Sequence, residues 1–471
     1  MKIGIKRFLL LSAAAVVAAN IGAEAPQTSI YQSNGGFSRL EGPVSISHIE
    51  AGSVNIAAIE ASSGRFMLET GTIDSIRVQA VGVPRVRITI PDYPDLQQVQ
   101  EKELYLDALI SIEGNGLIDD LAEGAVTVKG RGNSTWLFPK KPMRLKFNKK
   151  TAIGDFAKAK SYVLLANFID PTHMRNTLAL WLARELGMAW ANHSMPCDVT
   201  FNGNDLGTFL LTEKIGINAG SVDIDETKGI LLELSNDYDE KYKFYSATYG
   251  LPVMVKDPDF DEIAADNPSW GSPQSKLAQW KADFERAERL ASQGRGFEAF
   301  DLESFVDYML LYNVVLNGEI GWPKSLYIYK EKFGDDVKWM FGPAWDFDAS
   351  FNLEESIGNS FQTRPYAKEV WLNPLFIALK NTPGFIDLYV ERFKYFHSEI
   401  YPRMMDFFDE YAAYIEPSAK ANGQIWNYDY DTGWCLALNS FEHRNHVANL
   451  REWFGKRVAH LAFLANQNRY D

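Results

Sequence analysis

The segment from Lys129 to Lys150 is unusually basic. Its 22 residues include eight lysines and arginines and no acid, whereas the chain average of 47 bases in 471 residues predicts about two. Near its start, Gly130 to Ser134 form a glycine-containing turn that can bring backbone N–H groups close to an anion. The segment indicates an anion-binding site, with a solvated basic surface as the alternative. The eight bases are Lys129, Arg131, Lys140, Lys141, Arg144, Lys146, Lys149 and Lys150.

The second half of this segment has the alternation of a β-strand. Met143, Leu145 and Phe147 would point to one face, and Arg144 and Lys146 to the other. A row of cations on one strand face suits a polyphosphate, because arginine binds phosphate oxygens through two N–H groups at once. The alternative is an exposed face whose charge is balanced by neighbouring carboxylates.

Acids with metal-binding spacing lie much later in the chain. Asp346 and Asp348 are two residues apart, so in an extended segment both carboxylates point the same way and can share a hard cation such as Mg²⁺. Glu319 precedes the apolar run 326–329 and could bring a third carboxylate to the same place. The alternatives are a surface pair for the two aspartates and a plain turn for Glu319.

The hydrophobic periodicity of the sequence predicts the strands and helices that would position these residues. Asp170-Pro171 predicts the start of a strong helix that ends at Gly187. Asn202-Gly203-Asn204 predicts the turn of a hairpin. The other predicted strands are 85–90, 108–112, 125–129, 142–147, 198–201, 208–212, 325–329 and 339–341, and helices are predicted within 273–316 and 370–466.

The chain divides into three predicted parts. Residues 1–25 have a basic start, a short apolar stretch and an Ala-Glu-Ala cleavage site, as in a secretory signal, with an uncleaved anchor as the alternative. Residues 26–84 are light in charge and indicate a small β-rich accessory region. Residues 85–471 have the texture of one α+β domain with a helical C-terminal part. We therefore expect an exported protein without a transmembrane anchor once the signal is cleaved.

The net charge and the small numbers of cysteines and histidines argue against two classes of function, nucleic-acid binding and zinc binding. Cleavage after Ala25 takes the formal charge from −14 to −16, because it removes three bases and one acid. Such an acidic protein is a poor candidate for nucleic-acid binding, which needs basic surface. Two cysteines and seven histidines do not predict a zinc site, and whether Cys197 pairs with Cys435 cannot be deduced from the sequence.

Five sequence motifs resemble those of the CotH (spore coat protein H) kinase family and follow one another in the same order as in that family. The resemblance runs from about residue 85 to the C-terminus and implies an atypical protein-kinase-like fold. It also implies a protein that binds ATP with Mg²⁺ or Mn²⁺ and phosphorylates secreted or cell-surface proteins. The opening motif is Val128-Lys-Gly-Arg-Gly-Asn-Ser-Thr-Trp136 with the basic strand 139–147, and the later ones are residues 167–176, 207–213, 317–329 and 343–348.

The resemblance assigns roles to individual residues. By position, Trp345 would lie against adenine, Asp346 and Asp348 would bind the metal, and Glu319 would complete the metal shell or accept the substrate proton. The residues expected to bind the ATP phosphates are Arg131, Lys141, Arg144 and Lys146.

Two positions depart from the family pattern. Glu319 stands where an aspartate is frequent, and Ser325 stands where an asparagine is common. A pseudokinase that serves as a surface-binding protein is therefore an alternative to an active kinase. A second alternative is a phosphatase, because Asp346 to Ser350 fit the string D-x-D-x-S, although such a nucleophile usually ends a strand early in its domain. The signatures of ordinary protein kinases are absent from the sequence.

Overall fold

The computed structural model describes residues 39–40, 59–61, 64–70, 76–91, 101–351, 372–426 and 442–466. The predicted signal segment 1–25 lies outside these residues. Side chains are described from residue 82 onward. Among the helices of the described part, none is both long and apolar enough to cross a membrane.

Four strands precede the main body. They form one sheet in the order β1-β2-β3-β4, in which β1 and β2 are parallel and the other pairs antiparallel. The β-rich accessory region predicted for residues 26–84 stays a prediction, as does its boundary at residue 84. The bounds of the four strands are β1 Arg39–Leu40, β2 Ile59–Ala61, β3 Gly64–Thr70 and β4 Ile76–Val81.

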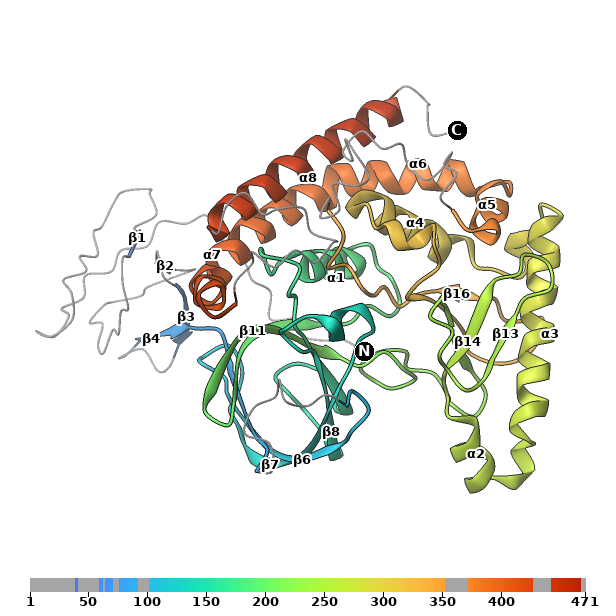
Figure 1. Ribbon diagram of the computed structural model, residues 1–471. Helices are drawn as coiled ribbons and strands as arrows, with labels where there is room; N and C mark the ends of the chain where they lie inside the picture. Colours follow the sequence, from blue (N-terminus) through green and yellow to red (C-terminus); the bar gives the residue numbers. More distant parts are fainter. Residues whose placement is uncertain are drawn as a thin grey trace, which may run out of the picture.

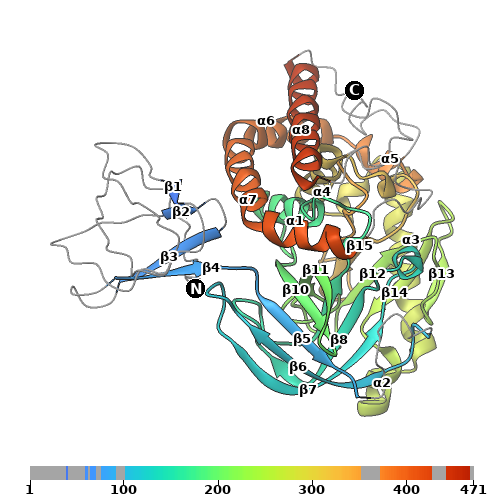
Figure 2. The same cartoon turned by 60° about the vertical axis from the view of Figure 1, so that its left-hand side comes forward.

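A closed barrel of seven strands follows (Figures 1 and 2). Its order is β10-β11-β9-β8-β7-β6-β5, and it closes where β5 runs parallel to β10, with Arg85 opposite Asp198. All the strands predicted between residues 85 and 212 are confirmed, but the closure was not predicted. The bounds are β5 Arg85–Thr89, β6 Leu106–Glu113, β7 Leu121–Gly130, β8 Met143–Thr151, β9 Ala159–Leu165, β10 Ser194–Phe201 and β11 Asn204–Glu213.

Strand alternation fills the barrel interior. Met143, Leu145 and Phe147 of β8 are buried in the barrel core, while Arg144 and Lys146 point outward, as their spacing predicted. The outer face of the barrel therefore carries the bases of β8.

A second sheet of five strands lies beside the barrel, in the order β13-β14-β12-β15-β16 (Figure 1). All neighbours are antiparallel, and the central strands β12 and β15 are buried along their whole length. The predicted strand pair 325–329 and 339–341 is confirmed as β15 and β16. The bounds are β12 Ile230–Leu234, β13 Lys243–Tyr245, β14 Pro252–Asp257, β15 Leu326–Lys330 and β16 Met340–Phe341.

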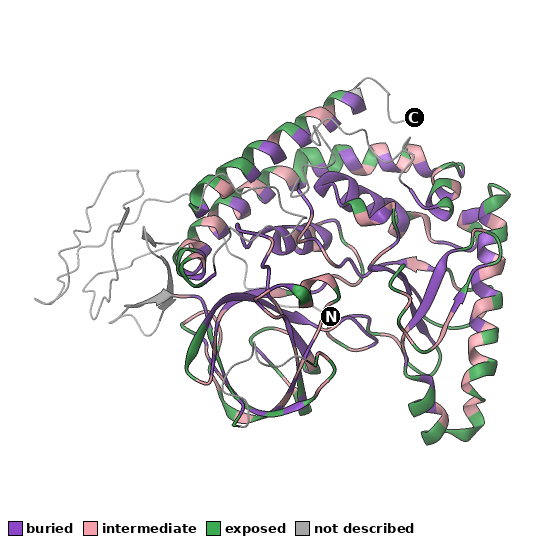
Figure 3. Cartoon of the chain, in the orientation of Figure 1, coloured by how far each residue is buried: buried purple, intermediate pink, exposed green. Residues whose placement is uncertain are grey.

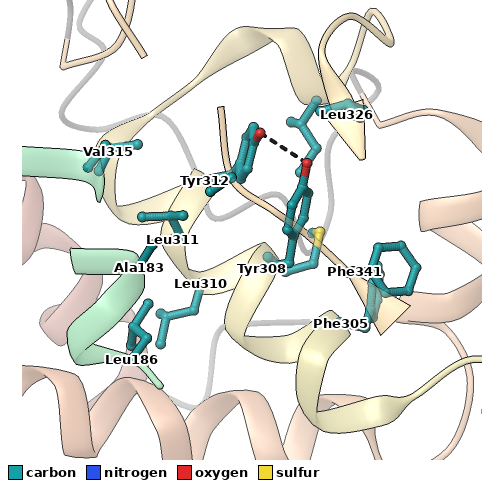
Figure 4. Packing of buried hydrophobic residues seen from close by; sticks show 14 of the residues in the cluster. Ala183, Leu186, Phe305, Tyr308, Leu310, Leu311, Tyr312, Val315, Leu326 and Phe341 are labelled. Carbon is teal, nitrogen blue, oxygen red and sulfur yellow. Dashed lines mark hydrogen bonds between the residues drawn. The ribbon is translucent and has the colours of Figure 1, made fainter. Parts of the chain in front are cut away.

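Helices cover both sheets. Figure 3 shows that α1 and α4 lie inside the molecule, whereas α3, α7 and α8 keep an exposed face. In Figure 4, α4 packs its aromatic residues under β15 and β16, and the hydroxyl of Tyr308 donates to that of Tyr312 at 3.0 Å. The bounds are α1 Arg175–Glu185, α2 Phe260–Asp266, α3 Pro273–Ser292, α4 Leu302–Val315, α5 Pro374–Lys380, α6 Phe385–Tyr395, α7 Tyr401–Ile425 and α8 His443–Asn466.

The start predicted for α1 was wrong by four residues. The helix begins at Arg175 rather than after Asp170, because His173 has a left-handed backbone with φ of 55°. Asp170 still satisfies the N-terminal N–H groups, since its carboxylate accepts from the backbone of Met174 at 3.0 Å and of Arg175 at 2.9 Å. The end at Gly187 is confirmed in position, with φ of 82° there.

Apolar side chains join the barrel to the second sheet. We call this cluster the barrel–sheet interface. It brings the outer face of β9 and the segment after β11 against β12 and β15. Its buried members are Val163, Ile215, Ile217, Val222, Leu231, Tyr327, Tyr329 and Trp345.

Candidate functional site

The Asp346 segment is fixed by hydrogen bonds from three directions. Asn317 donates its side-chain amide to the carbonyl of Asp346 at 2.8 Å. The backbone N–H of Phe347 donates to Oδ1 of Asn176 at 2.8 Å. The hydroxyl of Ser325 donates to Oδ2 of Asp346 at 3.3 Å. Residues from α1, from the loop after α4 and from the position just before β15 thus hold the backbone and the carboxylate of this segment.

Left-handed backbone conformations gather around this segment. Such conformations cost free energy in residues other than glycine and are concentrated at functional sites. They show that the local geometry is imposed by the surrounding packing. The residues are Asn167 (φ 47°), His173 (φ 55°), Leu316 (φ 50°), Ser325 (φ 53°), Asp346 (φ 68°) and Phe351 (φ 54°).

The loop before α1 anchors the far end of the acidic segment. Arg175 forms a buried ion pair with Asp170 and donates from Nε to the carbonyl of Ser350 at 2.9 Å. Because both charged partners are buried and paired, the loop and the acidic segment hold each other in place.

Two carboxyl groups of the site lie where negative charge is disfavoured. Burial raises the pKa of Glu319 well above its usual range, and the nearby Asp346 and Asp348 raise it further. Burial likewise raises the pKa of Asp348, and Asp346 and Asp170 add to this effect. Oε2 of Glu319 is buried and has no hydrogen-bond partner. Glu319, Asp346 and Asp348 therefore interact electrostatically at a place where a cation would relieve their repulsion.

Arg131 of the glycine-containing turn faces these acids. Burial lowers the pKa of its guanidinium, while Asp346, Tyr327, Asp348 and Glu233 oppose that shift. An arginine stays charged under these conditions. The structure thus brings the basic turn and the acidic segment, which are more than 200 residues apart in the chain, to one place.

A second contact holds the turn in this position. Asn133 donates to Oδ2 of Asp237 at 2.6 Å, and Nζ of Lys324 lies 3.8 Å from the same oxygen. The loop after β12 therefore connects the basic turn to the segment that carries Glu319. Sequence reasoning did not single out Asp237.

The indole of Trp345 is buried rather than open. It is 6% exposed and belongs to the barrel–sheet interface, and the guanidinium of Arg131 lies over its ring at 5.5 Å from the centroid. Arg131 and Trp345 are therefore neighbours, and Arg131 covers one face of the ring.

The remaining predicted bases are spread along the outer face of the barrel. Lys141 donates to the carbonyl of Trp136 at 2.6 Å and lies over its ring. Lys146 is exposed. Arg144 donates to the hydroxyl of Ser161 at 3.2 Å, and its Nε is buried without a hydrogen-bond partner. Of these three, only Arg144 has a buried group that lacks a partner.

Two bases that the sequence did not single out adjoin this face: Lys214 lies near Arg144, and Lys256 lies near Lys214. Burial, together with the charge of Arg144, lowers the pKa of Lys214 to about 8. Lys256 pairs with Glu233 at 2.9 Å and with Glu240 at 3.0 Å. Neither lysine belongs to a motif, so only the position of Lys214 directly after a predicted strand could have drawn attention.

Metal ligands are not fully assembled here. In the part of the chain that the structure describes, no three His, Cys, Asp or Glu side chains come close enough together to hold a metal ion. The donor set of Glu319, Asp346 and Asp348 is nevertheless all oxygen, as hard cations require.

A family model described as CotH kinase protein matches residues 128–461 of this chain. The chain belongs to the CotH kinase family. The match covers Arg131, Glu319 and Asp346, and so includes both the basic turn and the acidic segment. Among curated proteins, no sequence matches this chain.

Membership of the CotH kinase family makes phosphoryl transfer the first chemistry to consider at this site. The arrangement has cations from the barrel on one side and carboxylates on the other. Such a site suits an anionic ligand that carries a metal cation, because the bases can bind the anion and the carboxylates can bind the cation.

Proposed function

We propose that this CotH kinase family protein transfers the γ-phosphoryl group of ATP to a hydroxyl group of a protein substrate. The observation that carries the proposal is the position of Arg131, which lies over Trp345 and faces Asp346 and Asp348. A nucleoside triphosphate with its divalent cation offers negative phosphates to Arg131 and a positive metal ion to the two aspartates.

Each group has a proposed role. Arg131 and Arg144 bind the phosphates, and Trp345 contacts the adenine base once Arg131 has moved off its ring toward the phosphates. Lys141 and Lys146, further along the basic segment, remain proposed as additional phosphate contacts. Asp346 and Asp348 hold Mg²⁺ or Mn²⁺, which neutralises charge on the phosphates. Two carboxylates suffice, because such a cation takes further ligands from substrate phosphates and water. The unpartnered Oε2 of Glu319 supports this fit.

The proposed reaction moves one proton and one phosphoryl group. The acceptor oxygen forms a bond to the γ-phosphorus, and the bond from that phosphorus to the bridging oxygen breaks, so that ADP leaves. Glu319, if it is not a metal ligand, takes the proton of the acceptor hydroxyl. Its raised pKa suits it for this role, because a carboxylate with a raised pKa holds an accepted proton more tightly than an ordinary glutamate does.

Export and substrate class are part of the same proposal. The signal-like residues 1–25 support a location outside the cytoplasm, in the periplasm, at the cell surface or in the medium. The substrate would then be serine or threonine of a secreted or cell-surface protein.

The test is transfer of radiolabelled phosphate from ATP by the purified protein in the presence of Mn²⁺, with casein as acceptor. Asp346→Asn should lower the rate by about a thousandfold, which corresponds to ~4 kcal/mol of barrier. Asp335→Asn is the matched control, because Asp335 is an exposed acid that pairs with Arg286. Equal labelling by the wild type and Asp346→Asn would contradict the proposal.

A pseudokinase is the second candidate, favoured by Glu319 and Ser325 at their unusual positions. Thermal unfolding separates the two. A nucleotide-binding pseudokinase melts at a higher temperature with ATP and Mn²⁺ but transfers no phosphate. An active kinase shows both effects.

A further inference from the structure

Three cations converge where the outer face of the barrel meets the second sheet. We call Arg144, Lys214 and Lys256 the cationic cluster. Arg144 comes from β8, Lys214 follows β11, and Lys256 lies in β14. Like charges so close together cost free energy in the absence of an anion. The cluster therefore needs a physical explanation.

Strand register directs these side chains to the same interface. Val163 of β9 belongs to the barrel–sheet interface, and its register partners are Arg144 on one side and Thr212 on the other. Lys214 lies two residues after Thr212, so it continues on the same face. Ser161 links the two bases, since its hydroxyl accepts from Arg144 and its carbonyl accepts from the N–H of Lys214 at 3.4 Å.

The charges of the cluster are unequally compensated. Lys256 has two carboxylate partners, Glu233 and Glu240. Among the described residues, neither Arg144 nor Lys214 has a carboxylate within ion-pair distance. Nζ of Lys214 donates only to the carbonyl of Ile215, at 3.2 Å, and Nε of Arg144 is buried without a partner. Positive charge therefore remains at Arg144, and at Lys214 it is offset in part by Asp257 and Glu240, which lie beyond ion-pair distance.

Glu233 connects the cluster to the candidate site. It pairs with Lys256 and also acts on the charge of Arg131, and Tyr327 of β15 lies beside it as its register partner. Arg131 and Lys256 of the cationic cluster thus both interact with one buried carboxylate.

We infer that Lys214 and Arg144 together bind the polyphosphate chain of the substrate, and that Lys256, held by Glu233, is a positioning residue beside them. The inference rests on the proposed function for the identity of the anion. It assigns to Lys214 a binding role that no motif of the sequence indicates.

The test measures binding of inorganic tripolyphosphate by calorimetry, in EDTA, so that the metal-binding acids take no part. Lys214→Met should weaken the affinity by about tenfold, as expected for the loss of one charged hydrogen bond. Lys149→Met is the matched control, because Lys149 is an exposed base of β8 and should leave the affinity unchanged. Lys214→Arg should restore most of the affinity. Arg144→Lys provides a second variant should Lys214→Met not fold.

The affinity for tripolyphosphate should depend on pH in a way that it would not if Lys214 had only a structural role. The pKa of Lys214 is about 8, and the groups that face it are Arg144, Asp257, Lys256 and Glu240. Affinity of the wild type should fall as the pH rises from 7 to 9, because the ammonium loses its proton. In Lys214→Arg this fall should be smaller, since arginine keeps its charge.

The outcomes separate this inference from the proposed function. If Lys214→Met binds tripolyphosphate as the wild type does, the inference is wrong, whether or not the protein transfers phosphate. If the wild type transfers no phosphate but Lys214→Met loses affinity for tripolyphosphate, the anion site stands and the kinase proposal falls. If Lys214→Met raises KM for ATP about tenfold and Lys149→Met does not, both are supported.

Discussion

At the scale of single residues, Glu319 illustrates how a functional group can oppose stability. Its side chain is held near Asp346 and Asp348, and one oxygen lacks any hydrogen-bond partner. A buried, unsatisfied carboxylate among other acids destabilises the protein unless a cation or a proton joins it.

Glu319→Gln should therefore stabilise the metal-free protein by about 1 kcal/mol while it lowers phosphoryl transfer. The amide keeps the shape of the side chain and removes the repulsion. Differential scanning fluorimetry in EDTA should show a higher Tm than for the wild type, and Mn²⁺ should raise the Tm of the variant less. A lower Tm of Glu319→Gln in EDTA would show that the charge of Glu319 is compensated in a way that the structure does not reveal.

Glu288 of α3 predicts a pH dependence of stability outside the candidate site. Burial raises its pKa to about 7, while hydrogen bonds from the side chain of Ser246 and, at 3.4 Å, from the N–H of Thr248 oppose that rise. A raised folded-state pKa means that the folded protein holds the proton more tightly than the unfolded chain does. Stability is therefore greatest below the ordinary glutamate pKa and falls as the pH rises through about 7.

The wild type should lose about 2 kcal/mol of stability from this residue between pH 4.5 and 7.5. Glu288→Gln should flatten that part of the profile, which thermal unfolding at a series of pH values would measure. Glu285→Gln is the control, because Glu285 lies one turn earlier and accepts from Ala247 while partly exposed. If both variants keep the wild-type profile, Glu288 is not the titrating group.

At the scale of elements, the first turn of α1 positions the acidic segment. Asn176 accepts from the N–H of Phe347, and Asn317 donates to Asp346 from the other side. Asn176→Ala would leave a buried N–H without an acceptor, which costs about 1–3 kcal/mol.

Thr177→Ala is the control that distinguishes a loss of stability from a loss of activity in Asn176→Ala. Thr177 is the next residue and bonds the hydroxyl of Tyr411 at 3.2 Å, away from Asp346. Both variants should lower the Tm, but only Asn176→Ala should lower the rate of phosphoryl transfer, by about tenfold or more. Equal loss of activity in the two variants would mean that general destabilisation is the cause.

Local sequence predicted the elements better than their connections. The alternation of β8 predicted the outward direction of Arg144 because strand geometry is local. The start of α1 was missed because Asp170 binds N–H groups across a turn, and the left-handed His173 depends on tertiary packing. Periodicity carries no information on such contacts.

Only those residues of the candidate site that belong to a recognisable sequence pattern could be predicted. Arg131 and Asp346 were singled out by composition and spacing, and they lie near each other. Lys214 and Asp237 were missed because each takes its meaning from a neighbour far away in the sequence, Arg144 in one case and Asn133 in the other. Single residues without a pattern give no signal before the chain is folded.

At the scale of the whole molecule, the family match does not coincide with the fold. The match begins at residue 128, inside β7, whereas the barrel also contains β5 and β6. A fragment that starts at residue 128 would lack both strands and most of β7. It would expose the edges of β8 and β10, which could pair with other chains.

We therefore expect a fragment of residues 128–471 to aggregate and to unfold without a cooperative transition. A fragment of residues 82–471, which keeps every barrel strand, should be monodisperse and melt cooperatively. Light scattering and thermal unfolding of the two would decide. A soluble, cooperatively folded 128–471 fragment would mean that the closed barrel is dispensable.

Barrel closure also sets an order of events for the newly made chain. β5 must find β10, and Arg85 and Asp198 are 113 residues apart in sequence. Such distant pairing is slow, because the chain loses much entropy before the contact forms. One edge of β5 therefore stays unpaired until β10 reaches it, and during this interval a chaperone would protect the chain most effectively.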